Sequence, residues 1–179
     1  TDGVVVDAYG GEYGTSYFTG GFGLGTAYGN GDDGFDFRGY AYGNDGYAGV
    51  YVGMGFILSS GNGGDGLAAG AVAYDYSDAL VSVNVFGAAY FGNNGDDGVD
   101  LEGYAGYGGY AATVGNFFGA DIMFNADDGV SMDAAADEFG TALVGFSGDG
   151  VDISFNTDDG IEGDGYASYG GSVGLTVYL

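Results

Sequence analysis

The sequence predicts an all-β protein, an up-and-down antiparallel meander of about 12 strands that closes into a β-barrel. Three observations support this fold class. Asp-Gly pairs recur every 31 or 32 residues, and apolar and polar residues alternate over long stretches. Glycine is also too frequent for stable helices, with 43 glycines among 179 residues. Units of two strands and two turns therefore account for the whole chain.

The repeat is marked by an Asp-Gly pair followed by an apolar residue. Its glycines are Gly3, Gly34, Gly66, Gly98, Gly129 and Gly160. These positions divide a single domain, 1–179, into the hairpin units 3–34, 35–66, 67–98, 99–129, 130–160 and 161–179. Each unit has room for two strands joined by a short Gly-rich or Asn/Asp-containing turn. A longer acidic loop, such as NGDDG at 94–98, leads to the next unit.

Strands are predicted where the alternation has a period of two. In 47–60 and 79–91, valines and other apolar residues fall on one face, opposite Gly, Tyr, Ser and Asn. The same pattern covers 112–124 and the final stretch 172–179. An open meander of this size would leave two long edges that are prone to aggregation, so we expect it to close into a barrel. Such a barrel would be too wide for side chains to fill.

Composition excludes several classes of protein. One basic residue, Arg38, stands against 26 acidic ones, for a net charge of −25, and the chain has no His and no Cys. Nucleic acid is not an expected partner, because phosphates are bound by Lys and Arg. Cys nucleophiles, His bases and Lys Schiff bases are excluded by absence. The chain is nevertheless 46% hydrophobic, with 17 Tyr and 13 Phe, which argues against disorder.

The acidic residues of the strands share one face. The first strand of most units begins with apolar and acidic residues in alternation, as at 99–102. The acids of this polar face are Asp36, Asp100, Glu102, Asp133, Asp137, Glu162 and Asp164. In a membrane barrel they would line a water-filled lumen, and in a soluble assembly they would face solvent. Arg38 lies two residues from Asp36 on this face, and we expect it to pair with Asp36 or a neighbour.

The loops between units carry a second set of acids. These are Asp32, Asp33, Asp96, Asp97, Asp127, Asp128, Asp158 and Asp159. They serve either turn geometry alone or calcium as a cofactor, since calcium takes closely spaced oxygen ligands. Crowded along one rim, they would repel one another, so we expect a saline or calcium-containing setting. Because the same acids recur in every unit, a unique catalytic pair is not expected, and neither is enzyme activity.

The C-terminal residues resemble the terminal-strand signal of Gram-negative outer-membrane β-barrels. The signal residues are Ser172, Gly174, Val177 and Leu179, where the family usually ends in Phe. The phrases DDGVDL and GYA are also similar in style to acidic porins of alphaproteobacteria. This resemblance implies an outer-membrane channel for small solutes, with the lipid bilayer as a partner.

Two functions follow from these observations. The first is an outer-membrane channel that favours cations because its lumen is acidic, of which a designed nanopore is a variant. The second is a secreted, extracellular structural protein. Its copies would assemble into a fibre, sheath or surface layer through exposed strand edges or the apolar face, with calcium stabilising the assembly. A homo-oligomer is compatible with both functions.

Overall fold

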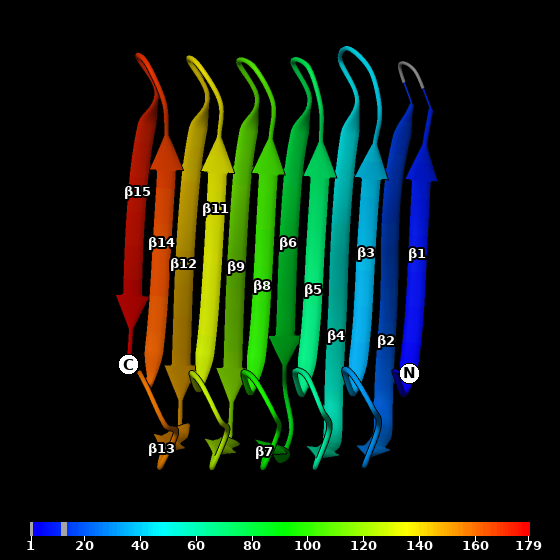
Figure 1. Ribbon diagram of the computed structural model, residues 1–179, viewed down its shortest axis with the longest axis vertical. Helices are drawn as coiled ribbons and strands as arrows, with labels where there is room; N and C mark the ends of the chain where they lie inside the picture. Colours follow the sequence, from blue (N-terminus) through cyan, green and yellow to red (C-terminus); the bar gives the residue numbers. More distant parts are fainter. Residues whose placement is uncertain (1, 12–13) are drawn as a thin grey trace.

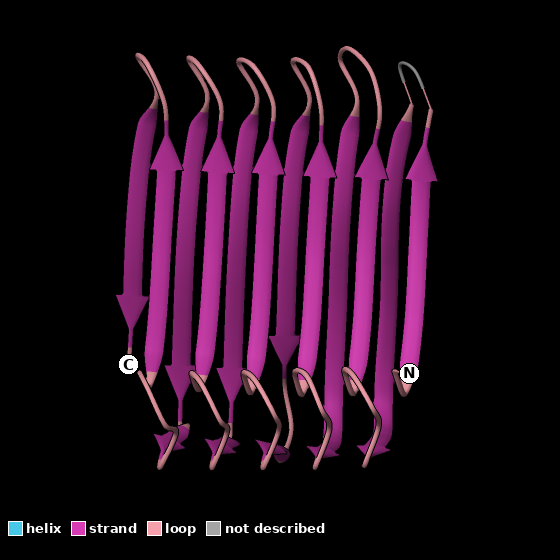
Figure 2. Cartoon of the chain, viewed as in Figure 1, coloured by secondary structure: helices cyan, strands magenta, loops and turns pink. Residues whose placement is uncertain are grey.

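The computed structural model describes residues 2–11 and 14–179, and its regular structure consists of β-strands. The chain winds as a parallel β-solenoid of about 6 turns. Each turn contributes to two sheets that lie one behind the other, and loops connect the sheets at both ends of the strands (Figures 1 and 2). Among the described residues there is no helix with the length and hydropathy that a membrane crossing requires.

The first sheet, sheet A, contains six strands of seven residues each, in the order β1-β3-β5-β8-β11-β14. Their bounds are β1 Val4–Gly10, β3 Phe35–Ala41, β5 Leu67–Ala73, β8 Val99–Ala105, β11 Val130–Ala136 and β14 Ile161–Ala167. Every pair is parallel and in the register of the repeat, so that Val130 lies between Val99 and Ile161. Equivalent residues of successive repeats are therefore neighbours.

The second sheet, sheet B, contains nine strands in the order β13-β10-β7-β4-β6-β9-β12-β15, with β2 paired to β4. The long strands are β2 Thr15–Tyr28, β4 Tyr47–Ser60, β6 Asp78–Val85, β9 Tyr110–Phe118, β12 Thr141–Asp149 and β15 Ser172–Tyr178. The short strands are β7 Ala89–Gly92, β10 Ala120–Met123 and β13 Asp152–Ser154. β4 pairs with β6 along its first part and with β7 along its last, so the short strands continue the paths of β6, β9 and β12.

The all-β class and the repeat are confirmed, but the antiparallel meander and the barrel are wrong. The two strands of each unit belong to different sheets, so the turn between them joins two layers and closes no hairpin. Each strand pairs with its equivalent in the next repeat, and all pairs are parallel. Alternation with a period of two places apolar residues on one face whatever the direction of the neighbouring strand. Because the strands do not form a barrel, the interpretation as a porin with transmembrane barrel strands is also wrong.

The core fills the space between the two sheets. Its largest fully buried side chains include Phe35, Phe37, Phe91, Phe117 and Phe146. Buried rings stack from turn to turn, as for Phe117 and Phe146, whose centroids are 5.6 Å apart with an interplanar angle of 17°. One cluster of buried apolar residues thus stands where the predicted barrel would have had a wide lumen.

Candidate functional site

The loops that lead from sheet B back to sheet A form one edge of the solenoid, the lower edge in Figure 1. We call it the acidic edge. It comprises loops 29–34, 61–66, 93–98, 124–129 and 155–160, and it contains all the turn acids that the sequence offered as calcium ligands. Backbone hydrogen bonds join neighbouring loops, as from Gly63 N to Asn30 O at 3.0 Å and from Gly95 N to Asn62 O at 2.8 Å. The loops therefore stack in the same register as the strands.

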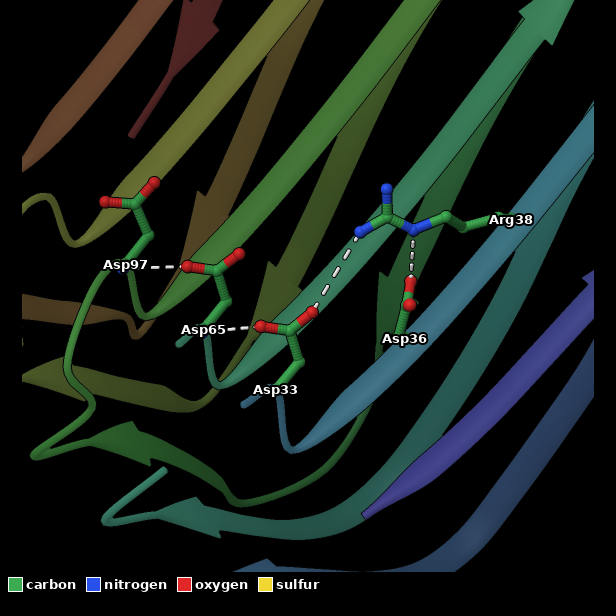
Figure 3. Close-up of polar contacts among 5 residues, drawn as sticks. All are labelled: Asp33, Asp36, Arg38, Asp65 and Asp97. Carbon is green, nitrogen blue, oxygen red and sulfur yellow. Dashed lines mark hydrogen bonds and ion pairs between the residues drawn. The ribbon is translucent and has the colours of Figure 1, made fainter. Parts of the chain in front are cut away.

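One aspartate of each loop belongs to a hydrogen-bonded ladder along this edge. The Oδ1 atom of Asp33 accepts a hydrogen bond from the backbone N–H of Asp65 at 2.9 Å, and Asp65 Oδ1 accepts one from Asp97 at 3.0 Å (Figure 3). The ladder continues to Asp128 at 2.9 Å and Asp159 at 2.8 Å. Each accepting carboxylate gains a donor from the next turn, but it also stands beside the carboxylate of that turn.

Burial and like charge raise the pKa of several acids at this edge. Burial is the main cause for Asp65, whose pKa is about 7, and for Asp97, whose pKa is about 6. Neighbouring aspartates raise both values further, whereas the backbone donors lower them. Burial, followed by the charge of Glu102, raises the pKa of Asp100 at the start of β8 to about 8. Near neutral pH, these groups either hold protons or carry charge that a bound cation would stabilise.

Arg38 neutralises one end of the acidic edge. Its Nε donates to Asp36 Oδ1 at 2.7 Å, and its Nη2 lies 4.0 Å from Asp33 Oδ2 (Figure 3). Burial still raises the pKa of Asp36, although the hydrogen bond from Arg38 opposes the shift. Because Arg38 is the only basic residue of the chain, the acids of the later turns receive no cationic side chain from this chain.

Three groups of carboxylates in the described part of the chain could hold a metal ion, since their oxygens lie within 4.8 Å of one another. The groups are Asp2, Asp32 and Asp33; Asp96, Asp97 and Asp127; and Asp127, Asp128 and Asp158. The sequence did not single out Asp2, and Asp159 belongs to none of these groups. Calcium takes 6–8 oxygen ligands, so backbone carbonyls or water would have to complete each shell. The donor chemistry fits calcium, and its binding stays a prediction.

The polar-face acids lie on the outward surface of sheet A, apart from one. Asp36, Asp100, Glu102, Asp133, Glu162 and Asp164 alternate with core residues along β3, β8, β11 and β14. Asp137 follows β11 in a loop of the opposite edge, where its Oδ2 accepts a hydrogen bond from Tyr104 Oη at 2.7 Å. Because the strand acids lie on the side of sheet A away from a packed core, they line no pore, and Asp36 among them is itself buried.

A buried asparagine ladder, which the sequence analysis missed, supports the acidic edge. The Nδ2 of Asn62 donates to Asn94 Oδ1, that of Asn94 to Asn125, and that of Asn125 to Asn156, each at 2.9 Å. Asn62, Asn94 and Asn125 are at most 3% exposed. Together with Asn30, these residues recur at the period of the repeat, which was the available signal. Identical amides at a fixed spacing hydrogen-bond when strands stack in parallel register.

Most glycines of the Asp-Gly pairs are required by the packing of this ladder, whereas Gly160, in the last turn, has no neighbour as close. A Cβ atom on Gly98 would lie 2.6 Å from Asn125 Nδ2 and 2.6 Å from the carbonyl oxygen of Gly129. Both atoms belong to the next turn and are held by hydrogen bonds. The Asp-Gly repeat thus combines a carboxylate that bonds to the next turn with a residue that lets that turn approach.

The opposite edge, where β1 leads to β2 and each later sheet A strand leads to sheet B, carries stacked rings. We call it the aromatic edge, and it comprises loops 42–46, 74–77, 106–109, 137–140 and 168–171. Its rings are Tyr42, Tyr74, Tyr76, Tyr107, Phe139 and Tyr169, all of them exposed. Tyr42 stacks on Tyr74 at 5.5 Å, and Phe139 meets both Tyr107 and Tyr169 edge to face at 5.7 Å.

The residues of the C-terminal signal lie in or just after β15, an outer strand of sheet B. Ser172 Oγ hydrogen-bonds Thr141 Oγ1 at 3.0 Å, and Gly174 pairs with Leu143 of β12. Val177 is 55% exposed and Leu179 is 88% exposed. Among the described residues, β15 has a neighbouring strand on one side alone.

Comparison with known protein families, with curated proteins and with solved structures gives no match to this chain.

Proposed function

We propose that the chain is an extracellular structural protein, a β-solenoid rod whose copies assemble by adding parallel strands to its outer strands. The observation that carries this proposal is that the outer strands have an unpaired edge. In the described part of the chain, β1 and β14 in sheet A and β2 and β15 in sheet B each pair on one side alone. Such edges present rows of unpaired N–H and C=O groups that favour pairing with another chain.

The two ends of the rod are complementary head to tail. In the inner turns, the residue after each Asp-Gly pair donates to the glycine carbonyl of the next turn, as from Val99 to Gly129 and from Val130 to Gly160, both at 3.1 Å. The N–H of Ile161 continues this series at one end, and the carbonyl of Gly3 continues it at the other. A second copy that places β1 beside β14 would extend the same ladder.

Core-facing side chains of β15 provide the apolar part of this junction. Val173, Leu175 and Val177 are 45%, 54% and 55% exposed, whereas their equivalents in β12 are at most 6% exposed. Placing β2 of a second copy beside β15 would bring Phe18 next to Leu175. Burial of these side chains favours association. Lys and Pro, which commonly protect sheet edges, do not occur in the chain.

The proposal includes cations at the acidic edge. Head-to-tail growth would lengthen the row of carboxylates, and repulsion along this row would oppose growth at low ionic strength. Salt or calcium would reduce this repulsion, which is the reason for placing the protein outside the cell.

The test is assembly of the 179-residue chain in buffered saline without detergent. We expect sedimentation velocity to show species that grow with concentration and electron microscopy to show thin filaments. The double variant Leu175→Asp/Val177→Asp should stop growth, because it places charge where the second copy would pack. Ala135→Asp, on the outward face of an inner strand of sheet A, is the control and should still grow. A wild-type chain that shows no growth at its highest soluble concentration contradicts the proposal.

A further inference from the structure

Much of the outward surface of sheet B is uncharged in an otherwise acidic chain, and the exposed acids Asp121, Asp149 and Asp152 of this sheet lie toward the acidic edge. Six strands, β2, β4, β6, β9, β12 and β15, present four rows of outward residues in register. The first two rows are Thr15, Tyr47, Asp78, Tyr110, Thr141, Ser172 and Tyr17, Gly49, Leu80, Ala112, Leu143, Gly174. The other two are Thr19, Tyr51, Ser82, Val114, Gly145, Thr176 and Gly21, Gly53, Asn84, Asn116, Ser147, Tyr178. We call these four rows face B, and Asp78 is their one charged residue.

The outward surface of sheet A has the opposite character. It carries seven acids, namely Asp7, Asp36, Asp100, Glu102, Asp133, Glu162 and Asp164, with Arg38 as its one base. In a chain with a net charge of −25, a second copy meets repulsion at sheet A and at the acidic edge. Face B is the broad surface where two copies can meet with the least repulsion.

Face B also has a relief that repeats from strand to strand. Along its second row, the sequence Gly49, Leu80, Ala112, Leu143, Gly174 alternates small and large side chains. The third row, Tyr51, Ser82, Val114, Gly145, Thr176, alternates with the opposite phase. Two hollows of about 170 Å³ each lie on this surface, one of them beside Ala112, Leu143 and Gly174 and the other beside Val114 and Gly145.

We propose that face B packs against face B of a second copy, so that two solenoids associate side by side. The leucines of one copy would enter the hollows of the other, as in the dry interfaces between paired β-sheets. A second copy has the same strand spacing of about 4.8 Å. The large side chains of one copy can therefore match the hollows of the other along the whole face. This contact uses outward side chains and not the unpaired backbone edges of β2 and β15, so it is independent of head-to-tail growth.

The polar groups of face B also favour a second copy over a ligand that needs hydrogen-bonding partners. Asn116 Nδ2 already donates to Asn84 Oδ1 at 2.9 Å, and Asp78 Oδ1 accepts from the backbone N–H of Tyr110 at 2.9 Å. The centre of the face consists mainly of Leu, Val, Ala and Gly, and its Ser82 Oγ accepts a hydrogen bond from Asn84 Nδ2 at 3.2 Å.

The experiment uses the double variant Leu175→Asp/Val177→Asp as its background, so that head-to-tail growth is blocked. We expect sedimentation equilibrium to show a dimer that tightens as sodium chloride is added, because salt screens the net charge. Leu143→Asp should raise the dimer dissociation constant at least about tenfold, since it buries charge in the contact. Gly145→Val adds no charge, and it should weaken the dimer by filling a hollow. A Cβ at 145 meets no atom closer than Val114 Cγ2 at 4.0 Å, so the monomer tolerates this change.

Ala135→Asp, on the outward face of sheet A, is the matched control and should leave the dissociation constant almost unchanged. A monomer in the blocked background overturns the face-to-face contact, even if the wild-type chain forms filaments one solenoid wide. A monomer that adsorbs to a flat solid such as ice or a polysaccharide crystal also overturns it and assigns face B to that surface. If the wild-type chain forms no filaments but the blocked variant forms dimers, head-to-tail growth is contradicted and the face-to-face contact is not.

Discussion

The acidic edge and the aromatic edge of the solenoid follow the same repeat but carry different kinds of side chain. Each edge has a left-handed residue at an equivalent position in successive turns. On the acidic edge these are Gly29, Gly61, Asn93, Phe124 and Phe155, and on the aromatic edge they are Asp45, Tyr76, Gly108, Phe139 and Gly170. Buried amides and carboxylates follow on the acidic edge, whereas exposed rings pack face to face or edge to face on the aromatic edge.

The difference shows what parallel stacking does to identical side chains. Because successive turns stack in register, each residue lies beside the equivalent residue of the next turn. Amides and rings gain from this arrangement, because amides hydrogen-bond in ladders and rings stack. Carboxylates repel one another, and the acidic edge offsets that repulsion with backbone donors and one arginine. We therefore expect the acidic edge to respond to mutation, pH and cations more strongly than the aromatic edge does.

The largest effect is expected from Gly98→Ala. Its Cβ would approach Asn125 Nδ2 and the carbonyl of Gly129, neither of which can move without breaking hydrogen bonds. Overpacking of this kind costs about 3 kcal/mol. Urea unfolding measures the loss. Gly23→Ala, whose Cβ meets nothing within 4 Å, should cost less than about 1 kcal/mol. Equal losses would contradict the packing role of the Asp-Gly glycine.

Asn94→Ala should cost about 2 kcal/mol, since it removes an acceptor from Asn62 and a donor from Asn125 in a buried ladder. Asn116→Ala removes a partly buried amide pair on face B and should cost about 1 kcal/mol. Thermal unfolding of both variants compares them. If Asn116→Ala costs as much as Asn94→Ala, burial does not decide the value of the ladder.

Stability should fall as pH rises from about 5 to about 8.5. The folded-state pKa values of Asp97, Asp65 and Asp100 are about 6, 7 and 8, above the ordinary value of 3.8. The folded chain therefore binds more protons than the unfolded chain between these limits, and its extra stability is lost as these groups ionise. Thermal unfolding at a series of pH values measures this fall as a decrease in Tm.

Asp97→Asn tests whether ionisation of Asp97 contributes to this dependence of stability on pH. The amide oxygen can still accept the hydrogen bond from Asp128 N–H, but the charge is gone, so Tm at pH 8 should rise and the slope should flatten. Asp97→Ala also removes the charge but leaves that donor unpaired, so it should be the less stable of the two. A slope unchanged in Asp97→Asn would place the titrating groups elsewhere.

Calcium should raise Tm at pH 7.5 more than sodium chloride of equal ionic strength does. The reason is that three carboxylates can share one ion, whereas sodium mainly screens. The variant Asp127→Asn, which removes a member of two of the three carboxylate groups, should reduce the calcium-specific part. Equal effects of both salts would show that the turn acids serve turn geometry and not calcium binding.

The smallest effect is expected on the aromatic edge. Phe139→Ala loses two edge-to-face contacts but keeps the left-handed backbone at φ 62°, and it should cost about 1–2 kcal/mol. Phe139→Gly loses the same contacts but accepts this backbone, so it should cost less. Chemical unfolding separates the two variants. The opposite order would show that the backbone at this position is not strained.

The sequence by itself determined the strand content, the position of the turns, the length of the repeat and the apolar face of each strand. Each of these depends on local residue types or on periodicity along the chain. The tertiary structure decided which strands pair and in which direction. A strand such as β8 shows the same alternation beside an antiparallel neighbour as beside its equivalents in β5 and β11. Only contacts between residues 31 or 32 positions apart separate a solenoid from a barrel, and the asparagines at 62, 94 and 125 make those contacts.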